Sequence, residues 1–389
     1  MADPPPPPEQ PSFAVAGNRL TLLDTGPRRL NALLHLIERA RERVRLLFYI
    51  YVDDHAGRRV RDALIAAARR GVRVSLTIDA MGSEPAARRD FFDPLAAAGA
   101  DVCQFIPRLG RRYLLRNHQK LAVADEDVAI VGGFNVQDSY FGTVADQAWR
   151  DLGLVVEGPA VPRLAGYYDA LSRWTHQPRG SMRSLRRMIG QWSEDAGALR
   201  WLLGGPTRRL SPWAKVVRHD MRQAQRTDII AGYFAPSPAM LRRLDKVGVR
   251  GRVRVVLPSR TDHGASLWAS HFTYAGLLRK GVEIYEYQPT KLHTKLYVID
   301  DVVHIGSANF DMRSLFLNME LMLRIEDPAF AAHVRAYVDG EVAASLRVTA
   351  ESYRARTTPW MRVKQFAAYF VMAILDPSVS RRLNFGDER

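Results

Sequence analysis

The sequence has little cysteine and no long apolar segment. Its 389 residues include one cysteine, Cys103, which excludes an intramolecular disulfide and a cysteine-based metal cluster. Cys103 lies in a strand-like stretch, so we expect it to pack in a core. No apolar run approaches the roughly 20 residues that a membrane-spanning helix requires. The N-terminus lacks the basic and apolar regions of a signal peptide, so we expect a protein that is cytoplasmic or peripheral to a membrane.

Acidic residues are also scarce relative to basic ones. The chain has 41 Asp and Glu against 56 Lys and Arg, which gives a net charge of +15 and a pI of about 10.2. This excess predicts an anionic partner, either nucleic acid or an acidic membrane surface, and charge alone does not distinguish the two. The hydrophobic content of 47% is ordinary for a globular protein. The length suits two core-bearing domains or one large duplicated unit.

One short pattern occurs twice, and the second histidine follows the first by 175 residues (293 − 118). Each copy has a histidine, a lysine two positions later, an aspartate five positions after the lysine, and a small-residue turn that ends in asparagine. The copies are His118, Lys120, Asp125 and Gly132-Gly133-Phe134-Asn135, then His293, Lys295, Asp300 and Gly306-Ser307-Ala308-Asn309. Both lie on apolar stretches that we predict to be buried strands, where positions i and i+2 share a face. Each histidine therefore projects beside its lysine, whereas Asp125 and Asp300 have the opposite parity and suit a structural role at the strand end.

An imidazole beside an ammonium group suits phosphoryl chemistry. Lysine supplies positive charge where phosphate charge develops, and histidine can attack phosphorus or transfer a proton near neutral pH. In the turns, Gly133 and Ser307 would let backbone N–H groups approach phosphate oxygens, and Asn135 and Asn309 would add side-chain donors. A single His-x-Lys pair is more often a satisfied histidine beside a solvated lysine. Two complete copies favour a catalytic pair, with one histidine as nucleophile and the other as acid.

The order of predicted elements is also repeated. Strands and helices alternate from residue 44 to 106 and again from 228 to 287, which predicts an α/β fold with largely parallel sheets. Gly71 and Gly251 are 180 residues apart, and Gly99 and Gly281 are 182 apart, close to the spacing of the histidines. These agreeing offsets indicate duplication and fusion of one ancestral half.

The duplicated H-x-K-x4-D and G-[GS]-x-N motifs resemble those of the phospholipase D superfamily. From about Asn18 to Ile325, the flanking sequence resembles bacterial cardiolipin synthases, especially the type without transmembrane helices. The resemblance implies an α/β fold of two pseudo-repeated halves, each a mixed, largely parallel sheet flanked by helices, with one active site between them. The second turn departs in one respect: five residues separate Asp300 from Gly306, whereas six separate Asp125 from Gly132. A shorter hairpin would account for this difference.

The resemblance also implies roles for individual residues. The catalytic set would be His118, Lys120, Asp125, His293, Lys295 and Asp300, and the phosphate-binding set would be Asn135, Asn309, Gly133 and Ser307. In this family, acidic residues at the positions of Asp151 and Glu320 bind the far nitrogen of each catalytic histidine. The alternative for both residues is an ordinary carboxylate at a strand end, and this alternative has more weight for Asp151 than for Glu320. No metal and no other cofactor is expected, because lysine and asparagine side chains already neutralise the phosphate.

Five regions are predicted along the chain. Residues 1–14 form a disordered proline-rich tail, 15–175 the first phospholipase D-like half, 176–225 a connecting basic amphipathic segment, 226–345 the second half, and 346–389 a C-terminal helical segment. In the connecting segment, Leu185, Met188, Ile189 and Trp192 have helical spacing beside arginines, which suits a bilayer surface or, alternatively, a core helix. Residues 360–374 are rich in aromatics and are either interfacial or packed on the body. The basic stretch 108–116 could gather anionic headgroups or be a solvated loop.

These observations predict a cardiolipin synthase-like phosphatidyltransferase that acts through a covalent phosphatidyl-histidine intermediate. His118 would attack the phosphodiester, His293 would protonate the departing alcohol, and a second lipid would accept the phosphatidyl group. The expected partners are anionic phospholipids such as phosphatidylglycerol and the cytoplasmic face of a membrane. Three alternatives stay open: a phospholipase D or phosphodiesterase hydrolase, a nuclease of the same superfamily, and a non-catalytic binding protein with a relict site. The apolar basic segments argue against nucleic acid, while the acceptor, the nucleophilic histidine and the oligomeric state stay open.

Overall fold

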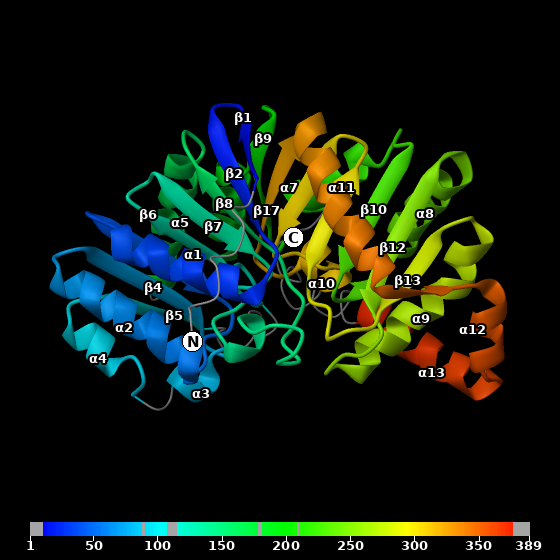
Figure 1. The fold of residues 1–389 in the computed structure, drawn as a ribbon, viewed down its shortest axis with the longest axis horizontal. Helices are drawn as coiled ribbons and strands as arrows, with labels where there is room; N and C mark the ends of the chain where they lie inside the picture. The colour runs from blue at the N-terminus through cyan, green and yellow to red at the C-terminus, as the bar shows by residue number, and fades with distance from the viewer. Residues whose placement is uncertain (1–10, 88–89, 107–114, 178–180, 208–209, 376–389) are drawn as a thin grey trace, which may run out of the picture.

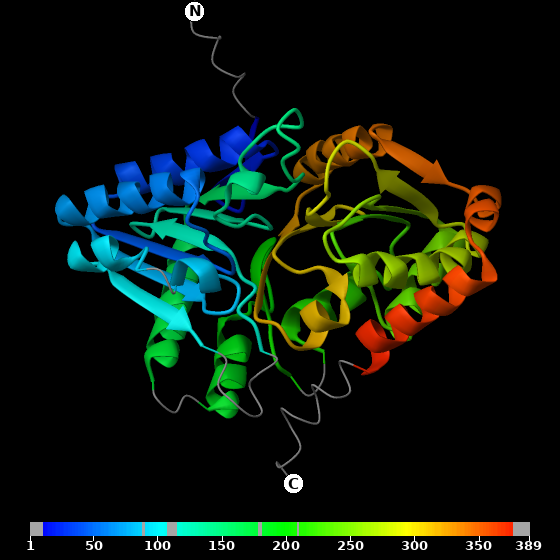
Figure 2. The same ribbon diagram turned by 90° about the horizontal axis from the view of Figure 1, so that it is seen from below.

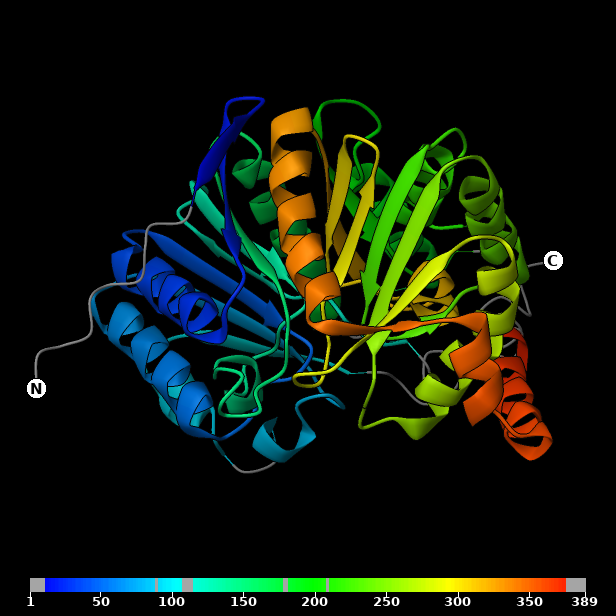
Figure 3. The ribbon, with the colours of Figure 1, turned by 45° about the vertical axis from the view of Figure 1, so that its right-hand side comes forward.

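The computed structural model describes residues 11–87, 90–106, 115–177, 181–207 and 210–375. Two eight-stranded mixed sheets lie side by side, and helices cover their faces (Figures 1 and 3). In the described ranges, no helix is long and apolar enough to cross a membrane. Most of the expected basic stretch at 108–116 lies outside the described residues.

The first sheet has the strand order β1-β2-β8-β7-β6-β3-β4-β5. Its strands β3, β4 and β5 pair in parallel, and the other neighbours are antiparallel. Helices α1 (Gly26–Arg39), α2 (His55–Arg69) and α4 (Asp93–Ala97) pack over one face, and α5 (Val161–His176) lies over the other. The strands are β1 (Ser12–Val15), β2 (Asn18–Leu23), β3 (Arg43–Phe48), β4 (Arg73–Asp79), β5 (Asp101–Phe105), β6 (Leu121–Ala124), β7 (Val128–Gly132) and β8 (Gly153–Glu157).

The second sheet has the order β18-β13-β12-β10-β14-β15-β17-β9. Its strands are β9 (Leu199–Gly204), β10 (Arg226–Ala231), β12 (Arg252–Pro258), β13 (Glu283–Tyr287), β14 (Lys295–Ile299), β15 (Val302–Gly306), β17 (Glu320–Glu326) and β18 (Ser345–Val348). The accompanying helices are α7 (Pro212–Asp220), α8 (Pro238–Arg250), α9 (Gly264–Arg279), α10 (Met312–Phe316) and α11 (Pro328–Ala343). The short strands β11 (Phe234–Ala235) and β16 (Phe310–Asp311) form a separate parallel pair.

The two sheets repeat one topology. The order β2-β8-β7-β6-β3-β4-β5 in the first matches β9-β17-β15-β14-β10-β12-β13 in the second, with parallel pairing confined to the same three strands. The predicted α/β fold of two repeated halves is therefore confirmed. The sheets are mixed, but they are not largely parallel as expected: only two of the seven neighbouring strand pairs in each are parallel, namely those joined by crossover helices.

The halves begin earlier than the sequence predicts. β9 and α7 correspond to β2 and α1, yet both lie within 176–225, which was expected to be a connecting segment. We therefore propose that the second half begins at β9. Likewise, β1 pairs with β2 from Ser12, inside the expected tail of residues 1–14. Residues 1–10 lie outside the described part of the chain.

The amphipathic helix in the connecting segment is a core helix. This helix, α6 (Met182–Trp192), buries Leu185, Met188 and Ile189 in a cluster that also contains strands of both sheets. The Trp192 ring packs against Gly166 of α5, where an added Cβ would lie 2.6 Å from it. The expectation that this face meets a bilayer is wrong, because the apolar face covers the junction between the halves.

Candidate active site

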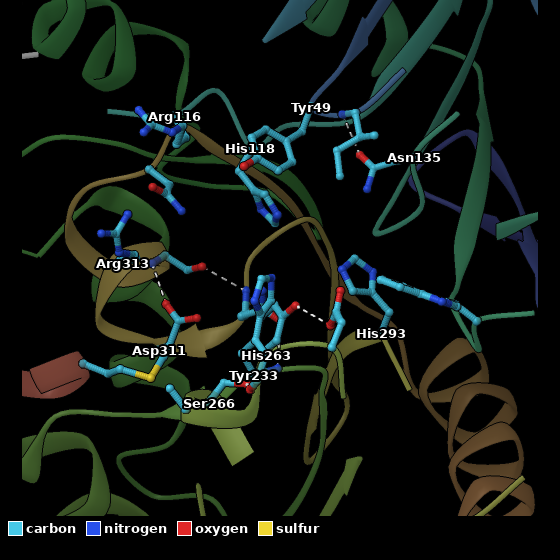
Figure 4. A pocket seen from close by; sticks show the side chains of 18 of the residues that line it. Tyr49, Arg116, His118, Asn135, Tyr233, His263, Ser266, His293, Asp311 and Arg313 are labelled. Atoms are coloured by element: carbon cyan, nitrogen blue, oxygen red, sulfur yellow. Dashed lines mark hydrogen bonds between the residues drawn. The ribbon is translucent and has the colours of Figure 1, made fainter. Parts of the chain in front are cut away.

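Both histidines line one cavity between the halves. The cavity has a volume of about 510 Å³ and receives side chains from both repeats (Figure 4). It lies beyond the carboxyl ends of β3 and β10, the usual location of ligand sites in open α/β sheets. Its lining includes His118, Asn135, Tyr49 and Arg116 from the first half, and His293, Asn309, Tyr233, His263, Asp311 and Arg313 from the second.

Short β-bridges between the halves bring the histidines there. Asn117 pairs with Met319, and the His118 N–H donates to the Met319 carbonyl at 2.9 Å. In the other copy, Leu292 pairs with Arg150, and the His293 N–H donates to the Arg150 carbonyl at 2.8 Å. Each histidine is thus tied to the residue that precedes a carboxylate of the opposite half.

The two histidines share one arrangement across the junction. His118 Nδ1 lies 3.1 Å from Glu320 Oε2, and His293 Nδ1 lies 2.6 Å from Asp151 Oδ2. Both carboxylates are fully buried. A carboxylate at Nδ1 holds the proton on that nitrogen and leaves Nε2 available to a substrate. Each half therefore supplies a histidine and the carboxylate that orients the other half's histidine.

Burial favours the neutral form of both rings. Desolvation lowers the pKa of His118, although Glu320 raises it in part. Desolvation and the neighbouring Lys295 lower the pKa of His293 to about 3. Burial alone would raise the pKa of Asp151, but Lys295 and His293 hold it below its ordinary value. The resting pairs thus consist of a neutral imidazole and a charged carboxylate, which is the form that a nucleophilic histidine requires.

The two lysines lie beside the histidines, as strand parity predicts. Lys120 and Lys295 are both about 1% exposed, and each ammonium group donates to the backbone carbonyl of its histidine. The Lys120 ammonium also lies 5.2 Å from the centre of the Tyr49 ring. Burial lowers the pKa of Lys120 well below its ordinary value and that of Lys295 to about 8. An anionic ligand would stabilise the charged form of both ammonium groups, because burial otherwise leaves them largely desolvated.

Asp125 and Asp300 lie away from this cavity. Asp125 accepts backbone N–H groups of residues 41–43 at 2.7–2.8 Å, and Asp300 accepts those of residues 225 and 226 at 2.8–3.3 Å. Each carboxylate thereby anchors the loop before β3 or β10 at the far strand ends. Their placement in the catalytic set is corrected, and the structural role that parity predicts is what the structure shows.

Asn135 and Asn309 occupy equivalent places at the cavity wall. The Asn135 Oδ1 accepts the Ile50 N–H at 3.1 Å, and the Asn309 Oδ1 accepts the Tyr233 N–H at 3.2 Å. This bond fixes each amide against the chain that leaves β3 or β10. The Asn135 amide nitrogen donates to the Tyr140 hydroxyl at 3.0 Å. Both asparagines keep their place as candidate phosphate ligands.

Ser307 and Gly133 support the carboxylates instead. The Ser307 hydroxyl donates to Glu320 Oε2 at 2.5 Å, and the Ser314 hydroxyl donates to Oε1 at 2.9 Å. A Cβ on Gly133 would lie 2.4 Å from Asp151 Oδ1 and 2.9 Å from Lys295 Cδ. The structure therefore favours other roles than phosphate binding here: Ser307 binds Glu320, and Gly133 leaves the space that Asp151 and Lys295 occupy.

Gly133→Ala is expected to lower kcat roughly 10- to 100-fold, because the added methyl group must displace Asp151 or Lys295 from the His293 pair. Steady-state kinetics would measure the change. Gly340→Ala on α11 is the matched control, since its Cβ meets nothing within 4 Å and alanine suits a helix. Equal kcat for the two variants would contradict this role of Gly133.

Two tyrosines that line the cavity were not singled out from the sequence. Tyr49 and Tyr233 follow the carboxyl ends of β3 and β10, and that position was the available signal. Arg116 and Arg313 add positive charge near His118. Asp311 caps α10 through the Ser314 N–H at 2.8 Å, and burial raises the pKa of Asp311 to about 6. Within the described ranges, no group of three or more His, Cys, Asp or Glu side chains is arranged to hold a metal ion.

Comparisons with known proteins agree with the duplicated fold. The family described as "Cardiolipin synthase, PLD-like domain" matches residues 33–169 and 217–341. Cardiolipin synthase A of Pseudomonas aeruginosa (strain LESB58) is 32% identical over 351 residues, which cover 87% of this chain and 70% of that protein. The major cardiolipin synthase ClsA of Bacillus subtilis (strain 168) is 30% identical over 374 residues, 92% of this chain and 76% of that protein.

A solved structure shares the fold at low sequence identity. The crystal structure of phosphatidylserine synthase from Haemophilus influenzae Rd KW20 superposes with a TM-score of 0.70 at 15% identity, and covers 94% of this chain and 95% of that one. At this identity, the likeness concerns the fold. The family match over both repeats and the two cardiolipin synthase relatives show that this chain belongs to the cardiolipin synthase, PLD-like domain family of the phospholipase D superfamily.

Proposed function

We propose that this protein is a cardiolipin synthase-like phosphatidyltransferase that works through a phosphatidyl-histidine intermediate. One observation carries the proposal: two histidines with carboxylate-bound Nδ1 atoms line one cavity, each beside a buried lysine. Membership of the family supports phosphatidyl transfer and phospholipid substrates. Two histidines at one cavity supply a nucleophile and an acid for the same phosphodiester.

The first step would form the covalent intermediate. The neutral Nε2 of one histidine, which we assign to His118, attacks phosphorus, and the bond from phosphorus to the alcohol oxygen breaks. His293, whose Nε2 takes up a proton as the anionic phosphodiester binds, gives that proton to the departing alcohol. Asp151 and the negative charge of the bound phosphodiester stabilise this protonated ring. Lys120, Lys295 and the two asparagines bind the oxygens on which charge develops.

The second step would return the enzyme to its starting state. The acceptor hydroxyl gives its proton to the now neutral His293 and attacks phosphorus, and the phosphorus–nitrogen bond to His118 breaks. A lipid glycerol hydroxyl as acceptor yields cardiolipin when phosphatidylglycerol is the donor. Water as acceptor yields phosphatidic acid, which is the hydrolase alternative. The same site chemistry serves both, so the product identifies the acceptor.

Lipid product analysis tests this function. The purified protein is incubated with phosphatidylglycerol alone and with added phosphatidylethanolamine, and the products are identified by mass spectrometry. We expect cardiolipin from phosphatidylglycerol, and equal yield in excess EDTA because no metal takes part. Phosphatidic acid as the main product would favour the hydrolase, and loss of activity that only added metal restores would contradict the metal-free mechanism.

The rate should depend on pH through Lys295. Its ammonium is charged below its pKa of about 8 and loses its proton above it. Because kcat/KM reports groups of the free enzyme, we expect it to fall more steeply above pH 8 than below it, by about a further factor of ten per unit. In Lys295→Arg the charge persists at high pH, so the alkaline fall should vanish even if the rate is lower. Lys280→Arg at the end of α9 is the control, and a wild-type profile that stays flat to pH 10 would contradict the assignment.

We also propose a peripheral location on the cytoplasmic face of a membrane. A cardiolipin synthase must reach headgroups at a bilayer surface, and the excess of basic residues favours anionic lipid.

A further inference from the structure

The C-terminal helices pack against the rest of the protein through one narrow face. α13 (Pro359–Tyr369) and the π-helical η2 (Phe370–Leu375) run along α9, as Figures 1 and 2 show. Gln365, Tyr369 and Ala373 are buried at intervals of four residues. The Tyr369 hydroxyl donates to the Pro236 carbonyl at 2.8 Å, and the Tyr369 ring stacks on Phe272 of α9 at 4.8 Å. The segment is thus anchored through one side only.

The opposite side is apolar and exposed. Seven of the 13 exposed large hydrophobic side chains in the described ranges lie on α13 and η2, and an eighth, Phe272 of α9, borders them with its ring centre 5.6 Å from that of Phe366. We call them the α13 apolar surface: Trp360 (65% exposed), Val363 (54%), Phe366 (52%), Phe370 (41%), Val371 (49%), Ile374 (39%), Leu375 (45%) and Phe272 (37%). Single exposed hydrophobic side chains are common, but seven of them within residues 360–375 indicate a binding surface.

The residues around this surface carry positive charge, which favours an anionic partner. No Asp or Glu occurs from Ser352 to Leu375, whereas this stretch contains Arg354, Arg356, Arg362 and Lys364. Arg356 pairs with Glu286, and the Lys364 ammonium lies 5.7 Å from the Trp360 ring and 5.8 Å from that of Trp268. Exposed aromatic and aliphatic groups beside cations without acids match an anionic bilayer surface.

The α13 apolar surface adjoins the candidate active site. Met372, which lies within η2 between the exposed Val371 and Ile374, lines the same cavity as both histidines. Asp311 and Ser314, at the start of α10, also line this cavity. A bilayer that contacts the exposed side of η2 would therefore lie beside the cavity into which headgroups must enter.

We propose that α13 and η2 dock on an anionic bilayer surface, with their apolar side chains in the boundary between headgroups and acyl chains. This docking places the cavity beside lipid headgroups. The choice of lipid as partner rests on the proposed function, because a lipid-modifying enzyme must contact its substrate at that boundary.

Vesicle binding tests the docking directly. The double variant Phe366→Ser/Phe370→Ser is compared with wild type on vesicles of phosphatidylglycerol and phosphatidylcholine, by flotation. We expect at least about tenfold weaker binding, because two aromatic side chains no longer enter the interface. Leu346→Ser, which removes an exposed hydrophobic side chain on β18, is the matched control and should bind as wild type. Binding of the double variant equal to that of wild type would overturn the proposal. So would a wild type that dimerises through this surface and binds vesicles no better than the variant.

Two further measurements separate docking from catalysis. On monomeric short-chain phosphatidylglycerol, the double variant should retain activity within about twofold of wild type, while its rate on vesicles should fall at least about tenfold. Equal losses on both substrates would overturn the docking role. If neither substrate is transferred by wild type, the proposed function fails, and quenching of Trp360 fluorescence by brominated lipid still tests the docking. That quenching should fall in Trp360→Phe, and unchanged quenching would overturn the proposal.

Discussion

Replacing either His118 or His293 by alanine should abolish phosphatidyl transfer, with kcat lowered by roughly 10⁴-fold or more. Each ring has a separate part in the double displacement, so the double variant should be little worse than either single one. The rings lie at the cavity wall and belong to none of the hydrophobic core clusters, so circular dichroism should show a folded protein. Product formation from phosphatidylglycerol measures the loss. His176→Ala, at an exposed histidine on α5, is the matched control.

The two single variants should also identify the nucleophile. With a labelled lipid, a covalent lipid adduct should be trapped on His118 and be missing in His118→Ala. In His293→Ala the adduct can still form from a donor with a good leaving group, because that alcohol needs no acid. An adduct on His293 would reverse the assignment. Near-normal turnover in either single variant would eliminate the paired-histidine mechanism.

Neutralising a carboxylate partner should have the next largest effect. Asp151→Asn or Glu320→Gln should lower kcat by roughly 10³- to 10⁴-fold while substrate binding changes little. An amide accepts a weaker hydrogen bond from Nδ1 and does not stabilise the charged ring, and it permits the wrong tautomer. Because Asp151 and His293 come from different halves, this loss would show that the two halves share one catalytic unit.

Steady-state kinetics separates this role from a purely structural one. A positioning role lowers kcat and shifts the acid limb of the pH profile, whereas a folding defect lowers the amount of active enzyme without moving the profile. Glu326→Gln, at the exposed end of β17, is the control for Glu320→Gln. Unchanged kcat in Asp151→Asn would show that the observed 2.6 Å contact to His293 has no catalytic part.

The local patterns were the parts of the fold that could be predicted. Alternation of apolar residues places His118 beside Lys120 and His293 beside Lys295, because two residues of one strand separated by one position must share a face. The same rule assigned Asp125 and Asp300 to the strand ends, and the loops that they hold were found there. The repeated spacing of motifs and glycines predicted two similar halves, which the matched sheet orders confirm.

Predictions that depend on which surfaces meet were less successful. The apolar stripe of α6 suits a bilayer or a core equally, because periodicity describes a face and does not identify what covers it. Its burial at the junction of the halves required the packing of both sheets. Ser307 and Gly133 were assigned to phosphate for a similar reason. A small residue in a turn permits close approach, but the sequence does not say that a carboxylate or a lysine approaches.

By itself, the sequence determined the reactive groups and their local geometry: two His-Lys pairs where the chain enters two buried strands, in two halves of one α/β fold. Only the tertiary structure decided that each histidine is oriented by a carboxylate from the other half, and that both rings line one cavity. The physical reason is separation along the chain. Strand parity acts over two residues, whereas the contact from His118 to Glu320 spans 202 positions and exists only once the two sheets have packed together.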